Sequence, residues 1–189
     1  HFLPKADLFR FLDSMAILKL NMLQLHLTDD QGWRVEIRKY PRLTEWTRRN
    51  TLAQLREQRD AKGRDVGLRG DYYTQDDLRQ LVAYAAERHI MVVPEIEMPG
   101  HAAAAVAAWP ELGNADTKME AGLLNRRPLK VFNANESTIR VIQDILSEVM
   151  EIFPSKFIHV GGDEVRKDEW KLSAAAQQRI RELGLKNEE

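Results

Sequence analysis

Apolar residues follow two patterns along this chain: the three- to four-residue spacing of amphipathic helices and the continuous runs of buried strands. The helical spacing predicts three long helices, which begin near Pro4, Thr74 and Asn135. Shorter helices are expected at 102–108 and 173–183. The continuous runs predict buried strands at 22–27, 90–97 and 156–160. Because helices separate these strands, the strands are expected to be parallel and the chain to have an α/β fold.

Two long stretches, 47–71 and 110–133, interrupt this alternation. Both contain several glycines and polar residues, and both come after the end of a predicted strand. Loops of this length in a compact domain are usually either functional or disordered. We therefore expect both stretches to lie on the face of the sheet where the strands end.

Each of the three predicted strands ends in, or is soon followed by, carboxylates or histidine. These residues are Asp29, Asp30, Glu95, Glu97, His101, Asp163 and Glu164. The carboxyl ends of parallel strands meet at one edge of a sheet, and active sites of barrels and open α/β sheets are built there. The sequence therefore predicts that these residues gather at one site.

The segment Gly161-Gly162-Asp163-Glu164 is the most informative part of that set. Two glycines permit a sharp turn, which could swing both carboxylates toward one spot. Two acids held together in different surroundings are what acid/base chemistry uses. A strand-end turn with two solvated acids explains the same residues, so both interpretations stay open at this point.

The other candidates also have structural alternatives. Paired Asp29 and Asp30 are common as turn caps, but their place after a buried strand favours a functional role for at least one. His26 shares strand parity with Gln24 and Thr28, so an interior hydrogen-bonded role is favoured for it. His101 lies close in sequence to Glu95 and Glu97, which favours a catalytic network over a simple cap. His159 is expected to be a hydrogen-bonded core residue.

Composition narrows the classes of function. The chain has 189 residues, of which 43% are hydrophobic, and a net charge of −1, so no electrostatic case exists for a nucleic-acid or anionic-membrane partner. No apolar stretch approaches the ~20 residues needed to cross a bilayer. Cysteine is absent, which removes thiolate ligands and nucleophiles. No signal peptide is visible, but the chain starts at His1 and is expected to be cut from a longer protein.

Three segments together resemble one known family. His159-Val160-Gly161-Gly162-Asp163-Glu164 looks like the signature of glycoside hydrolase family 20, the β-N-acetylhexosaminidases. The segments 25–34 and 94–101 are similar to two further motifs of that family, in the same order. The resemblance covers essentially the whole chain. It implies a (β/α)8 TIM barrel and hydrolysis of terminal β-linked N-acetylglucosamine or N-acetylgalactosamine with retention.

The resemblance also implies roles for individual residues. The substrate's own acetamido oxygen is the nucleophile in this family. Glu164 would be the general acid, and Asp163 would hold the acetamido N–H and stabilise the charged intermediate. Asp29 and His101 match the pair that supports the acid. His26 and Glu95 are counted among the supporting or substrate-binding residues, and no metal and no cofactor is needed.

Two departures from the family pattern matter. The substrate-clamping arginine would come immediately before His1, and the chain stops after what looks like the fourth barrel strand and its helix. Residues 1–189 are therefore expected to form one partial catalytic domain, about strands 2–4, with no second domain. We expect this part alone to be inactive or nearly so, and to self-associate through exposed barrel surfaces. The parent protein is expected to be periplasmic or secreted.

The same residues are also compatible with two other classes of function. Histidines and carboxylates of this set could bind a metal in a metal-dependent TIM-barrel hydrolase, although a strong spacing motif such as His-Glu-x-x-His is missing. A sugar-binding module without catalysis is the other alternative. The presence of both Asp163 and Glu164 argues against it for the parent protein.

Overall fold

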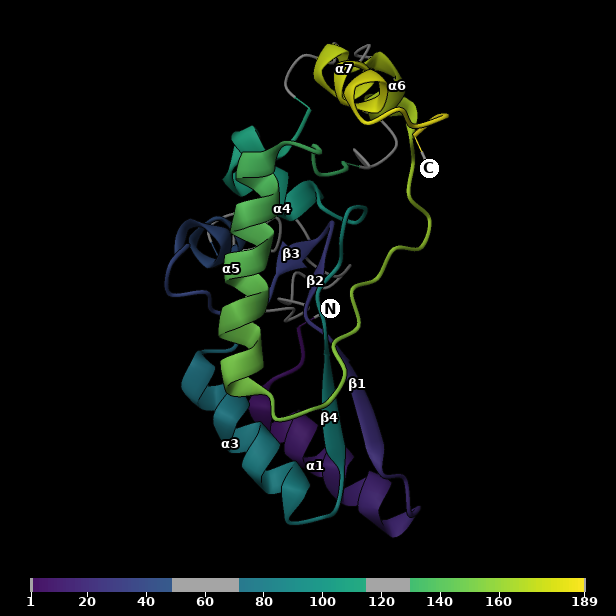
Figure 1. The fold of residues 1–189 in the computed structure, drawn as a ribbon. Coiled ribbons are helices and arrows are strands. Elements are labelled where there is room, and N and C mark those ends of the chain that lie inside the picture. The colour runs from purple at the N-terminus through teal and green to yellow at the C-terminus, as the bar shows by residue number, and fades with distance from the viewer. Residues whose placement is uncertain (1, 49–71, 115–129, 189) are drawn as a thin grey trace, which may run out of the picture.

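The computed structural model describes residues 2–48, 72–114 and 130–188. Most of the two long stretches predicted as loops therefore lies outside the described residues. Two predicted strands are confirmed as β1 (Met22–His26) and β4 (Met91–Glu95). They pair in parallel, with Leu23 opposite Val92. The helix α1 (Lys5–Ile17) precedes β1 in the sequence, and the helix α3 (Gln75–Ala86) precedes β4. These two helices pack against each other (Figure 1).

The third predicted strand joins the other side of β4. A parallel bridge pairs Glu95 with His159. The His159 N–H donates to the Pro94 carbonyl oxygen at 2.9 Å, and the Ile96 N–H donates to the His159 carbonyl oxygen at 2.9 Å. The parallel order expected from the sequence is thus confirmed, with β4 between β1 and the segment around residue 159.

The expectation that this third strand is buried is wrong for the described residues. Phe157 is 60% exposed and Val160 is 44% exposed, whereas Ile158 packs against the core. The physical reason is that this segment lies at the edge of the sheet. The described residues cover only part of the segment, so some of its apolar side chains are exposed.

The three long helices begin close to the predicted positions. Thr74 and Asp77 form a capping box at the start of α3: the Asp77 N–H donates to Thr74 Oγ1 at 3.0 Å, and the Thr74 N–H donates to Asp77 Oδ2 at 3.2 Å. Reciprocal bonds of this kind satisfy two N–H groups that a helix start leaves free. The long helix after Asn135 is α5 (Glu136–Ile152), which contacts α3.

The remaining elements are short. α4 (Ala103–Ala108) and the 3₁₀ turn η1 (Pro110–Leu112) follow β4. The helix expected at 173–183 is α7 (Ala174–Glu182), and α6 (Asp168–Leu172) precedes it. Residues 42–48 are helical. A hairpin of β2 (Thr28–Asp29) and β3 (Gly32–Trp33), which the sequence pattern did not predict, directly follows β1.

The core lies between the strands and the helices. Leu23 and Leu25 of β1 are buried, together with apolar residues of α1 and α3 such as Leu12 and Leu78. Alternation along β1 sends Gln24 and His26 to the other face, toward the end of β4. Within the described part of the chain, no helix combines the length and apolarity needed to span a membrane.

Candidate active site

Glu95, at the end of β4, is a buried carboxylate that three side chains surround. Gln24 Nε2 donates to Glu95 Oε2 at 2.8 Å, and His26 Nδ1 lies 3.1 Å from the same oxygen. From the other side, His159 Nδ1 lies 3.1 Å from Glu95 Oε1. Burial alone would raise the pKa of Glu95, but the hydrogen bonds from Gln24 and His26 lower it below its ordinary value. The contacts of Glu95 therefore favour its charged form inside the fold.

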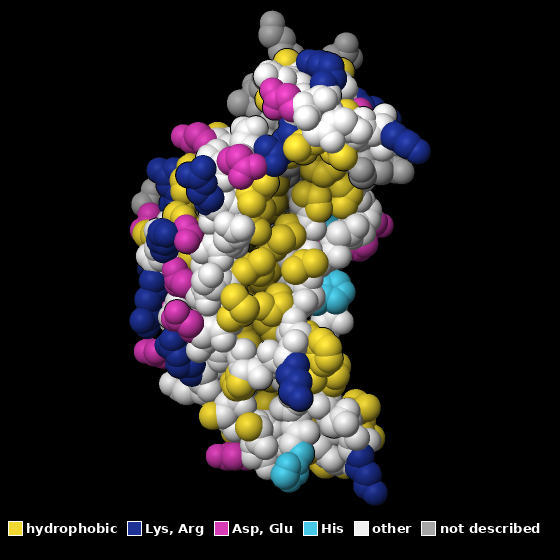
Figure 2. Space-filling model, in the orientation of Figure 1, with side chains coloured by type: hydrophobic (Ala, Val, Ile, Leu, Met, Phe, Trp, Pro, Cys, Tyr) yellow, Lys and Arg dark blue, Asp and Glu magenta, His cyan; other side chains and the backbone are white. Residues whose placement is uncertain are grey.

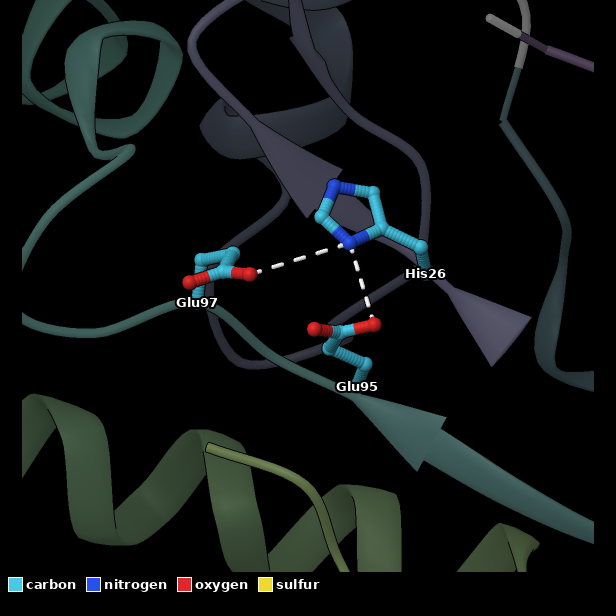
Figure 3. A group of neighbouring side chains, drawn as sticks. All are labelled: His26, Glu95 and Glu97. Atoms are coloured by element: carbon cyan, nitrogen blue, oxygen red, sulfur yellow. Dashed lines mark ion pairs between the residues drawn. The ribbon is translucent and has the colours of Figure 1, made fainter. Parts of the chain in front are cut away.

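Glu97 lies two residues further on and is 3% exposed. Its backbone N–H donates to Thr28 Oγ1 at 2.8 Å, which ties the end of β4 to β2. Its Oε1 lies 3.7 Å from His26 Nδ1, a longer contact than the one that His26 makes with Glu95 (Figure 3). Burial, followed by a hydrogen bond with Glu95 and the charge of Asp163, raises the pKa of Glu97.

Asp29 links two histidines. Its Oδ2 lies 3.2 Å from His26 Nε2, and its Oδ1 lies 3.2 Å from His101 Nδ1. Asp30 Oδ2 is 3.6 Å from the same His101 nitrogen. Burial would lower the pKa of His101, but the nearby charges of Asp29 and Asp30 raise it above its ordinary value. The protonated form of His101 is thereby favoured.

Asp30 also has a structural role, because its Oδ1 accepts a hydrogen bond from the Ala103 N–H at 3.0 Å, where α4 begins. Burial raises its pKa above the ordinary value for aspartate, despite that hydrogen bond. Of the two predicted aspartates, Asp29 thus makes the more direct contact with His101, and Asp30 also fixes the start of α4.

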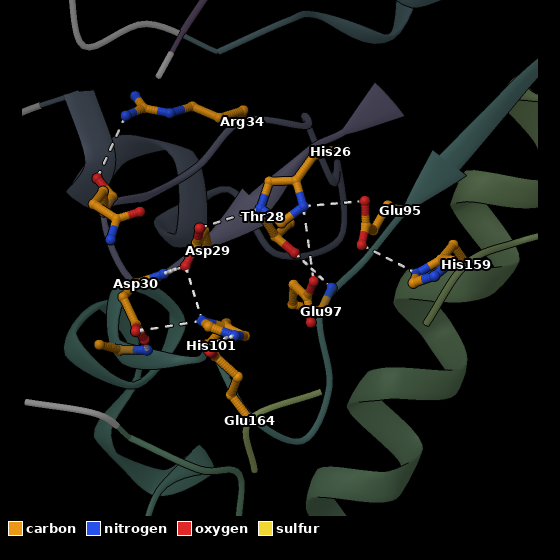
Figure 4. A network of polar contacts seen from close by, with 12 residues as sticks. His26, Thr28, Asp29, Asp30, Arg34, Glu95, Glu97, His101, His159 and Glu164 are labelled. Atoms are coloured by element: carbon orange, nitrogen blue, oxygen red, sulfur yellow. Dashed lines mark hydrogen bonds and ion pairs between the residues drawn. The ribbon is translucent and has the colours of Figure 1, made fainter. Parts of the chain in front are cut away.

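Glu164 reaches this network from the third strand. Its Oε2 lies 3.7 Å from His101 Nε2, so a continuous path of side chains runs from Asp29 through His101 to Glu164 (Figure 4). Asp163 lies near the same histidine, since carboxylate oxygens of Asp163 and Glu97 and a ring nitrogen of His101 fall within 4.8 Å of one another. The two adjacent acids do turn toward one spot.

The turn before these acids depends on its glycines. Gly161 and Gly162 have φ angles of +66° and +94°, which favour residues without a Cβ. A Cβ on Gly161 would lie 1.8 Å from Glu97 Oε2. Gly161 is thus required both by the backbone conformation and by the carboxyl group beneath it.

Three parts of the prediction need correction or addition. Asp163 and Glu164 are exposed, so burial does not distinguish them from solvated acids. His159 is not a core residue, because 45% of its side chain is exposed. The contacts of Gln24 with Glu95 and of Thr28 with Glu97 were not predicted, although strand parity places Gln24 and Thr28 on the face of His26.

The same side chains include the residue types that bind metal ions. Among the described residues, three groups place ligand atoms within 4.8 Å: His26 with Glu95 and Glu97, Asp29 with Asp30 and His101, and Glu97 with His101 and Asp163. Acidic groups of this kind are common without an ion. Each group is also explained by the hydrogen-bonded network, so the clusters alone do not favour a metal centre.

A comparison with known families and proteins matches the whole chain. The family model for the glycosyl hydrolase family 20 catalytic domain matches residues 1–189. A β-hexosaminidase of Porphyromonas gingivalis is 42% identical over 189 residues, which is 100% of this chain and 23% of that protein. A β-hexosaminidase of Vibrio furnissii is 37% identical over 97% of this chain and 30% of its own length.

Solved structures show the same relationship. A β-N-acetylhexosaminidase from Bacteroides fragilis has a TM-score of 0.80 at 33% identity, covering 100% of this chain and 34% of that one. An exo-β-N-acetylglucosaminidase from Vibrio harveyi, solved with N-acetylglucosamine, has a TM-score of 0.82 at 32% identity, covering 99% and 29%. The chain thus spans between about a quarter and a third of the length of these relatives, and its fold matches part of an α/β TIM barrel.

Proposed function

Because this chain belongs to glycoside hydrolase family 20, we propose that the protein containing it hydrolyses terminal β-linked N-acetylhexosamine residues with retention. In this proposal, residues 1–189 are one part of a single catalytic barrel. The substrate is an N-acetylglucosaminide or N-acetylgalactosaminide, and its own acetamido group takes part in the reaction.

The proposed reaction has two steps. Glu164 gives its proton to the glycosidic oxygen while the bond from that oxygen to C1 breaks and the acetamido oxygen bonds to C1. The leaving alcohol departs and a cyclic oxazolinium ion remains. The Glu164 carboxylate then removes a proton from water, the water oxygen attacks C1, and the acetamido group is restored. One residue serves as acid and then as base, as microscopic reversibility requires.

The observation that carries this proposal is the path from Asp29 through His101 to Glu164, with contacts of 3.2 and 3.7 Å. A protonated His101 would attract the Glu164 carboxylate and fix its position between the two steps. Asp163 lies beside this path with an exposed carboxylate, which suits a group that faces the positive charge of the intermediate.

The Asp163→Asn variant tests this role in a complete barrel that contains the chain. The substitution removes the negative charge and keeps the shape, so we expect a large fall in turnover and weaker binding of a thiazoline mimic of the intermediate. The matched control is Asp168→Asn, which changes an exposed aspartate in the first turn of α6. Unchanged affinity of Asp163→Asn for the thiazoline would contradict the proposal.

We further propose that the isolated chain 1–189 self-associates and has little activity. Figure 2 shows a band of apolar side chains between α5 and the segment that follows it. Met150, Phe157 and Val160, which lie on these two segments, are 58%, 60% and 44% exposed. Apolar surface and an open strand edge favour pairing with another copy.

The mass of the chain in solution and its turnover of a nitrophenyl N-acetylglucosaminide test this second proposal. We expect assemblies larger than a monomer, and a shift toward monomer in Phe157→Asp. The control is Leu183→Asp, which changes an equally exposed apolar residue at the end of α7. A monomer with robust turnover would show that the site is more self-contained than a partial barrel allows.

A further inference from the structure

Glu97 differs from every other acid of the site in how its two carboxyl oxygens are placed. The residue is 3% exposed, and its Oε2 is buried without a hydrogen-bond partner among the described residues. Its Oε1 lies 3.7 Å from His26 Nδ1, and that nitrogen is closer to Glu95. Glu95, by contrast, has Gln24, His26 and His159 at 2.8–3.1 Å.

We propose that Glu97 is a positioning residue that remains an uncharged carboxylic acid at neutral pH and supports the Gly161–Gly162 turn from below. The inference rests on the proposed function only in that this turn carries Asp163 and Glu164.

The first argument is the cost of burying a charge. An ionised carboxylate that is removed from water needs donors on both oxygens, and the described residues supply none to Oε2 of Glu97. Carboxylate oxygens of Glu95 and Glu97 lie within 4.8 Å of one another. Two carboxylates this close rarely both ionise, so one proton is shared between them. The three partners of Glu95 favour the charge there, which leaves the proton on Glu97.

The charged groups that face Glu97 agree with this assignment. Glu95 of β4 and Asp163 of the turn oppose a negative charge on Glu97, while His101, when protonated, favours one. His26 of β1 is engaged by Glu95 and by Asp29. The hydrogen bond between the two glutamates accordingly lowers the pKa of Glu95 and raises the pKa of Glu97.

The second argument is the contact with the turn. A Cβ on residue 161 would meet Glu97 Oε2 at 1.8 Å and its Cδ at 2.5 Å, so the carboxyl group occupies the space where a side chain would otherwise begin. Removing the carboxyl group would leave a cavity under the turn. A neutral group in this place supports the backbone without adding another negative charge beside Asp163.

Carbon-13 NMR of the side-chain carboxyls of residues 1–189 tests the charge. With Glu97 assigned through bonds from its backbone, we expect its carboxyl to titrate above the ordinary range for glutamate and that of Glu95 to titrate below it. The Glu111→Gln variant, which changes an exposed acid of η1, is the control and should leave both titrations unchanged. A Glu97 carboxyl that is ionised at neutral pH would overturn the proposal.

Two variants test the positioning role. Glu97→Gln keeps a neutral group of nearly the same shape, so the amide resonances of 161–164 and the titration of the His101 ring should stay close to those of the parent chain. Glu97→Ala should move those amide resonances. A fall in the pKa of His101 in Glu97→Gln would show that a negative charge had been removed, and would also overturn the proposal.

These measurements need no substrate. Loss of the proposed glycosidase activity would therefore leave the assignment of Glu97 standing, and an ionised Glu97 would leave the roles of Asp163 and Glu164 untouched. The wild-type titration remains decisive even where a variant does not fold.

Discussion

Two pairs of acids lie at the ends of neighbouring strands in this molecule, and their surroundings are opposite. Glu95 and Glu97 are both buried. Side chains of β1 and of the third strand hold Glu95, and Glu97 contacts His26 of β1. Asp163 and Glu164 are exposed, and the Glu164 side chain, which is 80% exposed, has an ion-pair contact with His101 at 3.7 Å.

In the proposed function, this difference separates the acids that support the backbone from the acids that react with the substrate. Groups that react with a substrate must be reachable from solvent, whereas groups that hold the backbone must be fixed by packing and hydrogen bonds. The buried pair therefore determines where the exposed pair can be, and the Gly161–Gly162 turn is the connection between them.

The largest expected effect concerns the exposed pair. In a complete barrel that contains the chain, Glu164→Gln should lower the rate on substrates with poor leaving groups by about 10²–10⁴-fold, the usual worth of general acid assistance. A nitrophenyl leaving group needs little protonation, so the first step should slow much less on that substrate. Equal losses of that step on both substrates would remove Glu164 as the acid.

A smaller effect is expected at the connection between the two pairs. Gly161→Ala places a Cβ against Glu97 at a φ of +66°, and a residue forced into such a conformation costs on the order of 1–3 kcal/mol. The free energy of unfolding in urea measures this loss. Gly184→Ala is the matched control, because Gly184 has a similar φ of +62° but open space around its Cα. Equal losses in the two variants would show that the contact with Glu97 adds nothing.

The buried pair should be visible in the pH dependence of stability. The pKa of Glu97 is raised in the folded state, so its contribution to stability is complete below the ordinary pKa of glutamate and is lost as the pH rises through the raised value. Unfolding of Glu97→Gln should lack this loss above the ordinary pKa of glutamate. Identical pH profiles for the variant and the parent chain would contradict the raised pKa.

The smallest effect on the site is expected from a change far from both pairs. Thr74→Ala removes the cap of α3 and should lower the free energy of unfolding by about 1 kcal/mol. The titration of His101 should not move, because the capping box belongs to the helical side of the core. Ser147→Ala, within α5, is a control in which no cap is lost. A shifted His101 titration in Thr74→Ala would show that the two regions are coupled.

Much of the fold could be predicted from the sequence because its signals are local. The capping box at Thr74 and the apolar runs of β1 and β4 are each contained within a few residues. The hairpin of β2 and β3 could not be predicted in the same way. Each of its strands has two residues, which is too short to show a period.

The sequence could predict which residues gather at the candidate site, but it predicted less well how they contact one another. Polar residues after buried strands identified Asp29, His101 and Glu164, because parallel strands bring their carboxyl ends together. The sequence could not show that Gln24 binds Glu95 or that Thr28 binds Glu97, since these contacts depend on the register between strands. The sequence also could not show which pair of acids is exposed, because the exposure of each pair depends on which segments pack over the edge of the sheet.

Glu95 has one further consequence for how the chain folds. Its two oxygens touch a histidine on each neighbouring strand, His26 on one side and His159 on the other. A slip of either neighbour by one residue would turn that histidine to the opposite face and leave a buried charge short of a partner. Glu95 thus favours one register of the three strands. The register that gives Glu95 both of its histidine partners is also the one that brings the acids of the site together.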